Sequence, residues 1–369
     1  MIQNKIQIDS YQLAIIVIAF SLGVGMLELP SYLGEALGNE SWIGTLLSGI
    51  LITLAVFLMC LAGKNFKDGG LVQNSKDLFG KTIGIVLILP IIISIFIANV
   101  IELKMFTITV KVFLLDQTPV QFLLIPFLLL VMFLGRGEFK HIIRFLSLVY
   151  PFIIIIILGL SVLTLPGTDF SNLLPVFQKT PFEYIDGVGR TMFAAMGVMS
   201  VIIMLPYAKK RDIKSSFKAC FLAVLFLIVL YTSITVLCLA KLGSSESRWI
   251  MYPTVSLIKS AYIPGGFIER LEGLLMSIWV IIVFATVTIT LYSLSILVSD
   301  ILNLVNRKLV MTIIIPLLYL GCFALTRTFK MYSVSNINSI VGGLYIIIVL
   351  PIIFIIGYKI KKKRGGCCD

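Results

Sequence analysis

The feature that most restricts how this chain can fold is a series of long apolar runs with almost no charge. The run FLAVLFLIVLYTSITVLCLA at 221–240 is one example. A helix needs about 20 apolar residues to cross the hydrocarbon layer of a membrane, and such a run is too long for the half-buried helix of a soluble protein. Only 13% of the residues are charged, and the mean hydropathy is +1.07. The sequence therefore predicts an all-α integral membrane protein.

The apolar segments predict ten transmembrane helices. These spans lie at 11–34, 41–62, 83–112, 120–135, 143–165, 185–208, 217–241, 270–298, 309–326 and 337–358. Residues 1–10 are polar, and no small-residue cleavage site follows the first apolar run, so no removable signal peptide is predicted. An even number of spans places both ends of the chain on the same side.

The distribution of Lys and Arg predicts which side that is. With residues 1–10 in the cytoplasm, the cytoplasmic segments carry 20 of the 30 basic residues, including the tail at 359–369. Cytoplasmic loops of membrane proteins are enriched in Lys and Arg, so both termini are predicted to be cytoplasmic. The net charge of +12 is then explained by loops that face anionic lipid, and nucleic acid is not needed as a partner.

Two spans carry helix breakers at corresponding places. The first reads SLGVGMLELP at 21–30, and the sixth reads AAMGVMSVIIMLP at 194–206. Five spans separate them, which predicts an inverted repeat with halves at 11–165 and 185–358, joined by an outer loop at 166–184. Interrupted helices in two inverted halves point to a substrate site, where free N–H groups bind a carboxylate and free carbonyls bind an ammonium group or a cation. The alternative is that these glycines mark close helix packing.

Several motifs occur in an order that resembles one family. They are SWIGTLLSG, LDQTPVQ, GRGEFKHIIRF, NLLPVF, MYPTVSLI and GGFIERLEGLLMSIWV, which together with the first broken span cover roughly residues 7 to 300. This series resembles the B subunits of spore germination receptors, the GerAB-type spore permeases of the amino acid–polyamine–organocation superfamily. The resemblance implies a LeuT-type fold with ten helices in a 5+5 inverted repeat and with helices 1 and 6 broken.

The resemblance also implies a role. It implies a nutrient-sensing subunit in the inner membrane of an endospore, acting with an A subunit and a lipoprotein C subunit. The chain departs from the family pattern at two positions. Glu272 stands where Asp is expected, and Val198 follows the glycine of span 6 where related sequences often carry Glu.

The candidate ligand residues lie on spans 1, 3, 6 and 8. They are Ser21, Gly23, Val24, Gly25, Glu102, Phe193, Ala194, Gly197, Thr286 and Thr290. Glu102 is a candidate site for a ligand ammonium group or a proton, because ionisable groups at membrane depth usually face a cavity or a partner; the alternative is a position near the outer leaflet. Thr286 and Thr290 share a helix face, and ordinary packing is the alternative to ligand contact. The small apolar residues suit a compact amino acid with an apolar side chain, and the alternatives are a purine, a sugar or potassium.

A charged cluster stands at the outer end of span 8. It contains Glu269, Arg270 and Glu272, and the family resemblance favours a structural latch at an outer gate over direct substrate contact. The alternative is a solvated cluster that contributes under about 1 kcal/mol.

Enzyme chemistry has no support in the sequence. His141 is the only histidine, and the six cysteines show no metal-ligand spacing, so neither a metal nor another cofactor is predicted. Cys367 and Cys368 follow a basic run and are candidates for acylation, with free thiols as the alternative.

Three functional classes remain open. The first is a receptor subunit that binds a small nutrient, the second is a working amino-acid or cation permease, and the third is a passive scaffold. Span 5 has no lysine within its apolar run and span 6 has no glutamate, so coupling groups for transport are depleted. The receptor is therefore the preferred interpretation.

Overall fold

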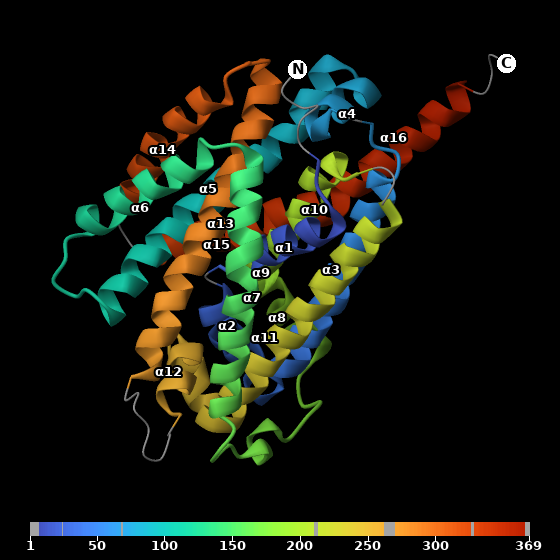
Figure 1. Cartoon of the computed structure of the whole chain (residues 1–369). Helices are drawn as coiled ribbons and strands as arrows, with labels where there is room; N and C mark the ends of the chain where they lie inside the picture. Colours follow the sequence, from blue (N-terminus) through green and yellow to red (C-terminus); the bar gives the residue numbers. More distant parts are fainter. Residues whose placement is uncertain are drawn as a thin grey trace.

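The computed structural model describes residues 7–23, 25–67, 69–209, 213–261, 270–325 and 328–365. Almost all of these residues are helical (Figure 1). The helices are α1 (Ser10–Ser21), α2 (Gly25–Leu37), α3 (Ser41–Gly63), α4 (Gly70–Phe79), α5 (Lys81–Phe113), α6 (Val120–Gly135), α7 (Phe139–Leu163), α8 (Pro181–Arg190), α9 (Met192–Ala195), α10 (Met199–Met204), α11 (Ile213–Trp249), α12 (Pro253–Lys259), α13 (Leu271–Leu302), α14 (Arg307–Ala324), α15 (Thr328–Ile337) and α16 (Leu350–Gly365). Short 3₁₀ segments include η3 (Phe170–Leu173), η4 (Met196–Val198) and η5 (Leu205–Tyr207), and π-helical turns cover Asn338–Gly342 and Tyr345–Val349.

The ten predicted spans correspond to these helices. Within the described part of the chain, seven helical stretches are long and apolar enough to cross a membrane. An eighth span is formed by Pro181–Ala194 and Met196–Tyr207, which meet at a bend of 51°. The shorter apolar helices α1 and α6 match the inner half of span 1 and span 4. The prediction of an all-α membrane fold with broken first and sixth spans is confirmed.

The structure corrects several boundaries. Helix α8 begins at Pro181, inside the predicted outer loop 166–184, because Thr180 and Glu183 form a capping box that starts a helix there. Helix α11 continues to Trp249, and Gly243 with φ 75° separates its last part from the span proper. Helix α16 runs through most of the predicted tail, to Gly365.

Two helices outside the spans were not predicted. Helix α4 lies between the second and third spans, and its C-cap is Gly80 with φ 84°. Helix α12 follows α11 and begins with Pro253 in its first turn, where a missing N–H costs nothing. Figure 1 shows α4 and the end of α16 at one end of the molecule and α12 at the other. We name these the inner end and the outer end, because the charge pattern predicts that the first faces the cytoplasm.

The broken helices lie inside the bundle. In Figure 1, α1, α9 and α10 lie near the middle of the molecule, where α1 packs against α7, α11 and α13, and α10 packs against α3. Of the long helices, α13 is the most buried, whereas α6 and α7 expose large apolar side chains such as Phe122, Phe133 and Phe152. A membrane protein places such faces against lipid.

Candidate functional site

The site begins at the break between α1 and α2. Breaking a helix frees carbonyl groups in its last turn, and these need other donors in hydrocarbon. The carbonyl of Ala19 accepts hydrogen bonds from the Thr286 hydroxyl at 2.8 Å and the Tyr150 hydroxyl at 3.4 Å. The carbonyl of Ser21 accepts one from the Tyr231 hydroxyl at 2.5 Å. Hydroxyl groups from α13, α7 and α11 thus satisfy backbone carbonyls that were expected to bind an ammonium group or a cation.

The carboxylate of Glu102, from α5, lies directly against the backbone of the break. A Cβ atom at Gly23 would be 2.2 Å from Glu102 Oε1 and 2.9 Å from its Cδ, so a side chain at this position would displace the carboxylate. Glu102 is buried. The start of α2, at Gly25, presents the N-terminal end of a helix dipole close to the break, which favours a negative charge.

The residues around Glu102 enclose a cavity of about 50 Å³. Its lining includes nine of the ten predicted ligand residues: Ser21, Gly23, Gly25, Glu102, Phe193, Ala194, Gly197, Thr286 and Thr290. The tenth, Val24, lies outside the described residues. The space holds a few water molecules at most, so a larger ligand requires the surrounding helices to move apart.

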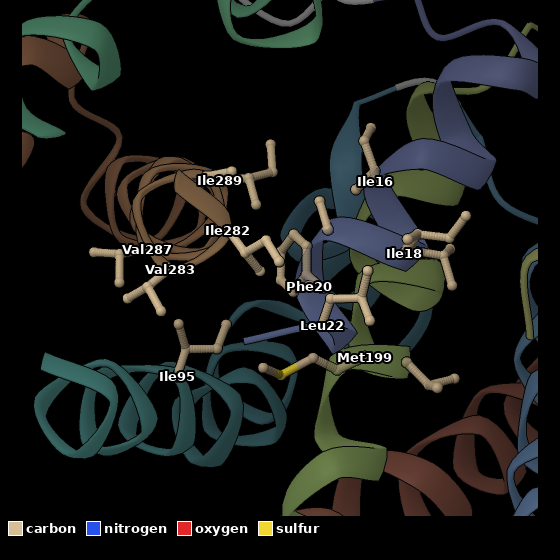
Figure 2. Packing of buried hydrophobic residues seen from close by; sticks show 14 of the residues in the cluster. Ile16, Ile18, Phe20, Leu22, Ile95, Met199, Ile282, Val283, Val287 and Ile289 are labelled. Atoms are coloured by element: carbon tan, nitrogen blue, oxygen red, sulfur yellow. The ribbon is translucent and has the colours of Figure 1, made fainter. Parts of the chain in front are cut away.

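Apolar side chains close the region around the break. Figure 2 shows Phe20 and Leu22 from the end of α1 near Ile95 of α5, Met199 of α10 and Ile282 of α13. These side chains are buried and pack in one continuous core. A charged group next to these apolar side chains lies in a medium of low dielectric constant, where electrostatic interactions are stronger than in water.

The glycines of the two broken spans also allow the helices to pack closely. A Cβ atom at Gly197 would be 2.5 Å from the Cα of Ser21 and 2.6 Å from the carbonyl oxygen of Phe20. A Cβ atom at Gly25 would be 3.1 Å from that of Ala194. The two broken spans therefore touch backbone to backbone, and the interpretation as packing glycines and the interpretation as site glycines apply to the same residues.

A second cavity, of about 40 Å³, flanks the same contact. Ser21 and Ala194 line both cavities. The second is almost entirely apolar, and Val198 of span 6 lines it. An apolar group fits this side of the contact, whereas Glu102 makes the first cavity acidic.

Two buried polar residues, on α5 and α2, were not predicted from the sequence. Asn99 lines the first cavity, and its Oδ1 accepts a hydrogen bond from the Thr290 hydroxyl at 2.7 Å. Glu28 on α2 is also buried: its Oε2 accepts a hydrogen bond from Tyr32 at 3.1 Å, and its Oε1 has no hydrogen-bond partner among the residues that the structure describes. A charged residue within an apolar span is a recognised signal of a functional position, so Glu28 could have been found.

The predicted outer gate lies partly outside the described residues, so it stays a prediction. Glu269 lies outside them, and Arg270 is exposed. Neither Arg270 nor Glu272 forms a salt bridge with another described residue. Among the described residues at the outer end, Glu35 of α2 and Arg190 of α8 form a salt bridge at 2.6 Å that joins span 1 to span 6.

A corresponding pair closes the inner end. Lys209, which follows η5, forms a salt bridge with Asp9 at 2.6 Å, and Ile8 pairs with Ala208 in a parallel β-bridge. Both ends of the two broken spans are therefore joined, which agrees with the small size of the cavities between them.

The cysteines add no site within the described residues. Cys60, Cys220, Cys238 and Cys322 are free and buried. Cys367 and Cys368 lie outside the described residues, so their acylation stays a prediction.

Solved structures with a similar fold are transporters. The nucleobase-cation-symport-1 family transporter Mhp1, in a closed conformation with bromovinylhydantoin bound, matches with a TM-score of 0.68 at 14% identity, covering 93% of this chain and 78% of that chain. MhsT in complex with L-phenylalanine matches with a TM-score of 0.59 at 16% identity, covering 91% and 87%. These matches establish the LeuT-type fold.

Sequence comparison identifies closer relatives. Spore germination protein GerQB of Bacillus cereus is 27% identical over 361 residues, covering 97% of this chain and 98% of that protein. Spore germination protein A2 of Bacillus subtilis (strain 168) is 28% identical over 288 residues, covering 78% of each. The family model described as "Spore germination protein" matches residues 7–331. The chain therefore belongs to the spore germination protein family of membrane proteins, and it is not an enzyme.

Proposed function

We propose that this chain is the nutrient-sensing subunit of a germination receptor in the inner membrane of a spore. It binds a small nutrient, an amino acid by preference, where spans 1 and 6 are broken. It passes the signal to an A subunit and a lipoprotein C subunit. The family match and the transporter fold support a receptor or permease role, and the cavity at the break supports the position of the ligand.

The position of the Glu102 carboxylate against Gly23 is the observation that carries the proposal. A fixed carboxylate in a buried cavity favours a ligand that brings a positive group, such as the ammonium group of an amino acid. The neighbouring apolar cavity, beyond Ser21 and Ala194, suits a small apolar side chain. The fold alone does not select the ligand, since one similar structure holds L-phenylalanine and another holds bromovinylhydantoin.

Binding requires a change of conformation, and this is how a signal arises. Cavities of about 40 and 50 Å³ are too small for an amino acid, and salt bridges join spans 1 and 6 at both ends. A ligand that binds a wider state a hundredfold more tightly shifts the equilibrium by about 2.8 kcal/mol. Such a population shift needs differential affinity and no ion gradient.

Binding measurements on the purified full chain test the proposed site. A panel of amino acids is screened for an increase in melting temperature, and the dissociation constant of the best one is measured. Replacing Glu102→Gln removes the charge with little change of shape, and we expect at least tenfold weaker binding. Glu246→Gln, at an exposed position of α11, is the matched control and leaves binding unchanged. Equal affinity of the Glu102→Gln variant would contradict the assigned site.

The second candidate function is an amino-acid or cation permease, which the transporter fold favours. Reconstitution into vesicles separates the two. A receptor subunit shows saturable binding of the nutrient without concentrative uptake under sodium or proton gradients. Gradient-dependent accumulation of labelled amino acid would overturn the receptor proposal in favour of the permease.

A further inference from the structure

A large cleft opens at the inner end, beside the start of α1, which contributes Gln12 to its lining. It has a volume of about 620 Å³ and lies between the turn that joins α6 to α7, the end of α13 and the start of α14. Four basic residues line it: Lys140, Arg144, Arg307 and Lys308. We call this cleft, with its four basic residues, the basic cleft.

The positive charge of the basic cleft is only partly balanced. Among the described residues, Glu138 is the one acidic residue in its lining, and it forms a salt bridge with Lys140 at 2.6 Å. Arg144, Arg307 and Lys308 form no salt bridge with any residue that the structure describes. An anion that enters the cleft therefore meets uncompensated charge.

Arg307 holds the wall of the cleft in place. Its guanidinium donates hydrogen bonds to the carbonyl oxygens of Gly135 at 3.0 Å and Gly137 at 2.8 Å, and it lies 3.9 Å above the ring of Tyr292. These acceptors are neutral, so they fix the side chain without cancelling its charge. The turn between α6 and α7 is thereby fastened to the start of α14, which gives the cleft a defined shape.

An apolar hollow adjoins the basic cleft. It has a volume of about 730 Å³ and shares Gly137 and Lys308 with the cleft. The rest of its lining is the apolar side chains of Leu129, Met132, Phe133 and Leu134 on α6, together with Arg136 and His141 at its inner edge. Phe133 is 82% exposed. An apolar surface of this kind on a membrane helix is covered by acyl chains.

We propose that the basic cleft and the apolar hollow together bind an anionic phospholipid. Its phosphate lies between Arg144 and Lys308, and its acyl chains run along α6. Arginine and lysine are the common partners of phosphate, and basic pockets between helices on the cytoplasmic side suit the head groups of anionic lipids. An acidic peptide from a partner protein would match the charge of the cleft but not the apolar hollow, so the lipid is the better fit.

The test uses the full-length protein in a nonionic detergent, titrated with phosphatidylglycerol or phosphatidylcholine while the melting temperature is recorded. We expect phosphatidylglycerol, and not phosphatidylcholine, to raise the melting temperature saturably. The double variant Arg144→Ala, Lys308→Ala should bind phosphatidylglycerol about 30-fold more weakly, which corresponds to about 1 kcal/mol per basic residue. The control Lys64→Ala, Lys81→Ala removes the same charge from other inner loops and should change the affinity less than twofold.

Two further arms identify the source of the phosphate. Inorganic phosphate and a polyglutamate peptide are titrated in the same way, and both should stabilise the protein far less than phosphatidylglycerol. The exposed-site variant Phe133→Ser tests the hollow separately and should weaken phosphatidylglycerol binding several-fold. Equal stabilisation by both lipids, by inorganic phosphate or by the peptide would overturn the proposal, and so would an equal loss in the two double variants.

Discussion

Replacing Gly23→Ala tests the contact at the centre of the proposed site. The added Cβ would stand 2.2 Å from Glu102 Oε1, and ordinary contact begins at 3.4 Å, so the carboxylate must retreat by about 1.2 Å. The clash is with the far end of a flexible side chain rather than with backbone. The variant should therefore fold and reach the membrane, while the carboxylate no longer occupies its place at the break.

The displacement can be converted into a change in affinity. An ammonium group hydrogen-bonded to a carboxylate lies about 2.8 Å from it, and a retreat of about 1.2 Å increases this to about 4.0 Å. At an effective dielectric constant of about 20, the attraction falls from about 6 to about 4 kcal/mol. The loss of roughly 2 kcal/mol corresponds to about 30-fold weaker binding.

The assay is the dissociation constant of the amino acid that the thermal-shift panel identifies. The control is Gly343→Ala, whose Cβ would meet its nearest neighbours, on Met192 and Met196, at 3.9 Å. A second variant combines Gly23→Ala with Glu102→Asp, whose side chain is one methylene shorter and relieves the clash. We expect the double variant to bind more tightly than the sum of the two single losses allows. Unchanged affinity of Gly23→Ala, or an equal loss in the control, would refute the reasoning.

Three other expectations follow from the packing and from the charge pattern. Gly197→Ala places its Cβ 2.5 Å from the Cα of Ser21 in α1 and should lower the free energy of unfolding by about 2 kcal/mol or more, measured as a lower melting temperature. The control Gly159→Ala, whose Cβ would have nothing within 4 Å, should leave the melting temperature unchanged. Tyr32→Phe removes the hydrogen bond to a buried carboxylate and should destabilise by about 1–3 kcal/mol, and an unchanged melting temperature would show that this bond contributes nothing. A cysteine introduced at Lys210 should react only with reagents on the cytoplasmic side and one at Asp169 only from outside; reaction of both from one side would contradict the predicted orientation.

Much of the architecture was determined by sequence alone. Apolar runs of about 20 residues have to become helices in a membrane, since no other local structure satisfies the backbone there, and this predicted the all-α fold correctly. Glycine and proline act through their own backbone preferences, so the breaks at 21–30 and 194–206 could be placed without any knowledge of packing. The halves of the inverted repeat at 11–165 and 185–358 and the cytoplasmic position of both termini stay predictions.

Only the tertiary structure determined which side chains form hydrogen bonds and salt bridges with the broken spans. Tyr231 reaches the carbonyl of Ser21 from 210 positions away, and Arg190 pairs with Glu35 across the outer end of the broken spans. Such partners depend on how helices pack and rotate against one another, and a local pattern carries no information about that. For the same reason the sequence could place Glu102 in span 3 but not against Gly23, where the absence of a single Cβ admits the carboxylate to the break.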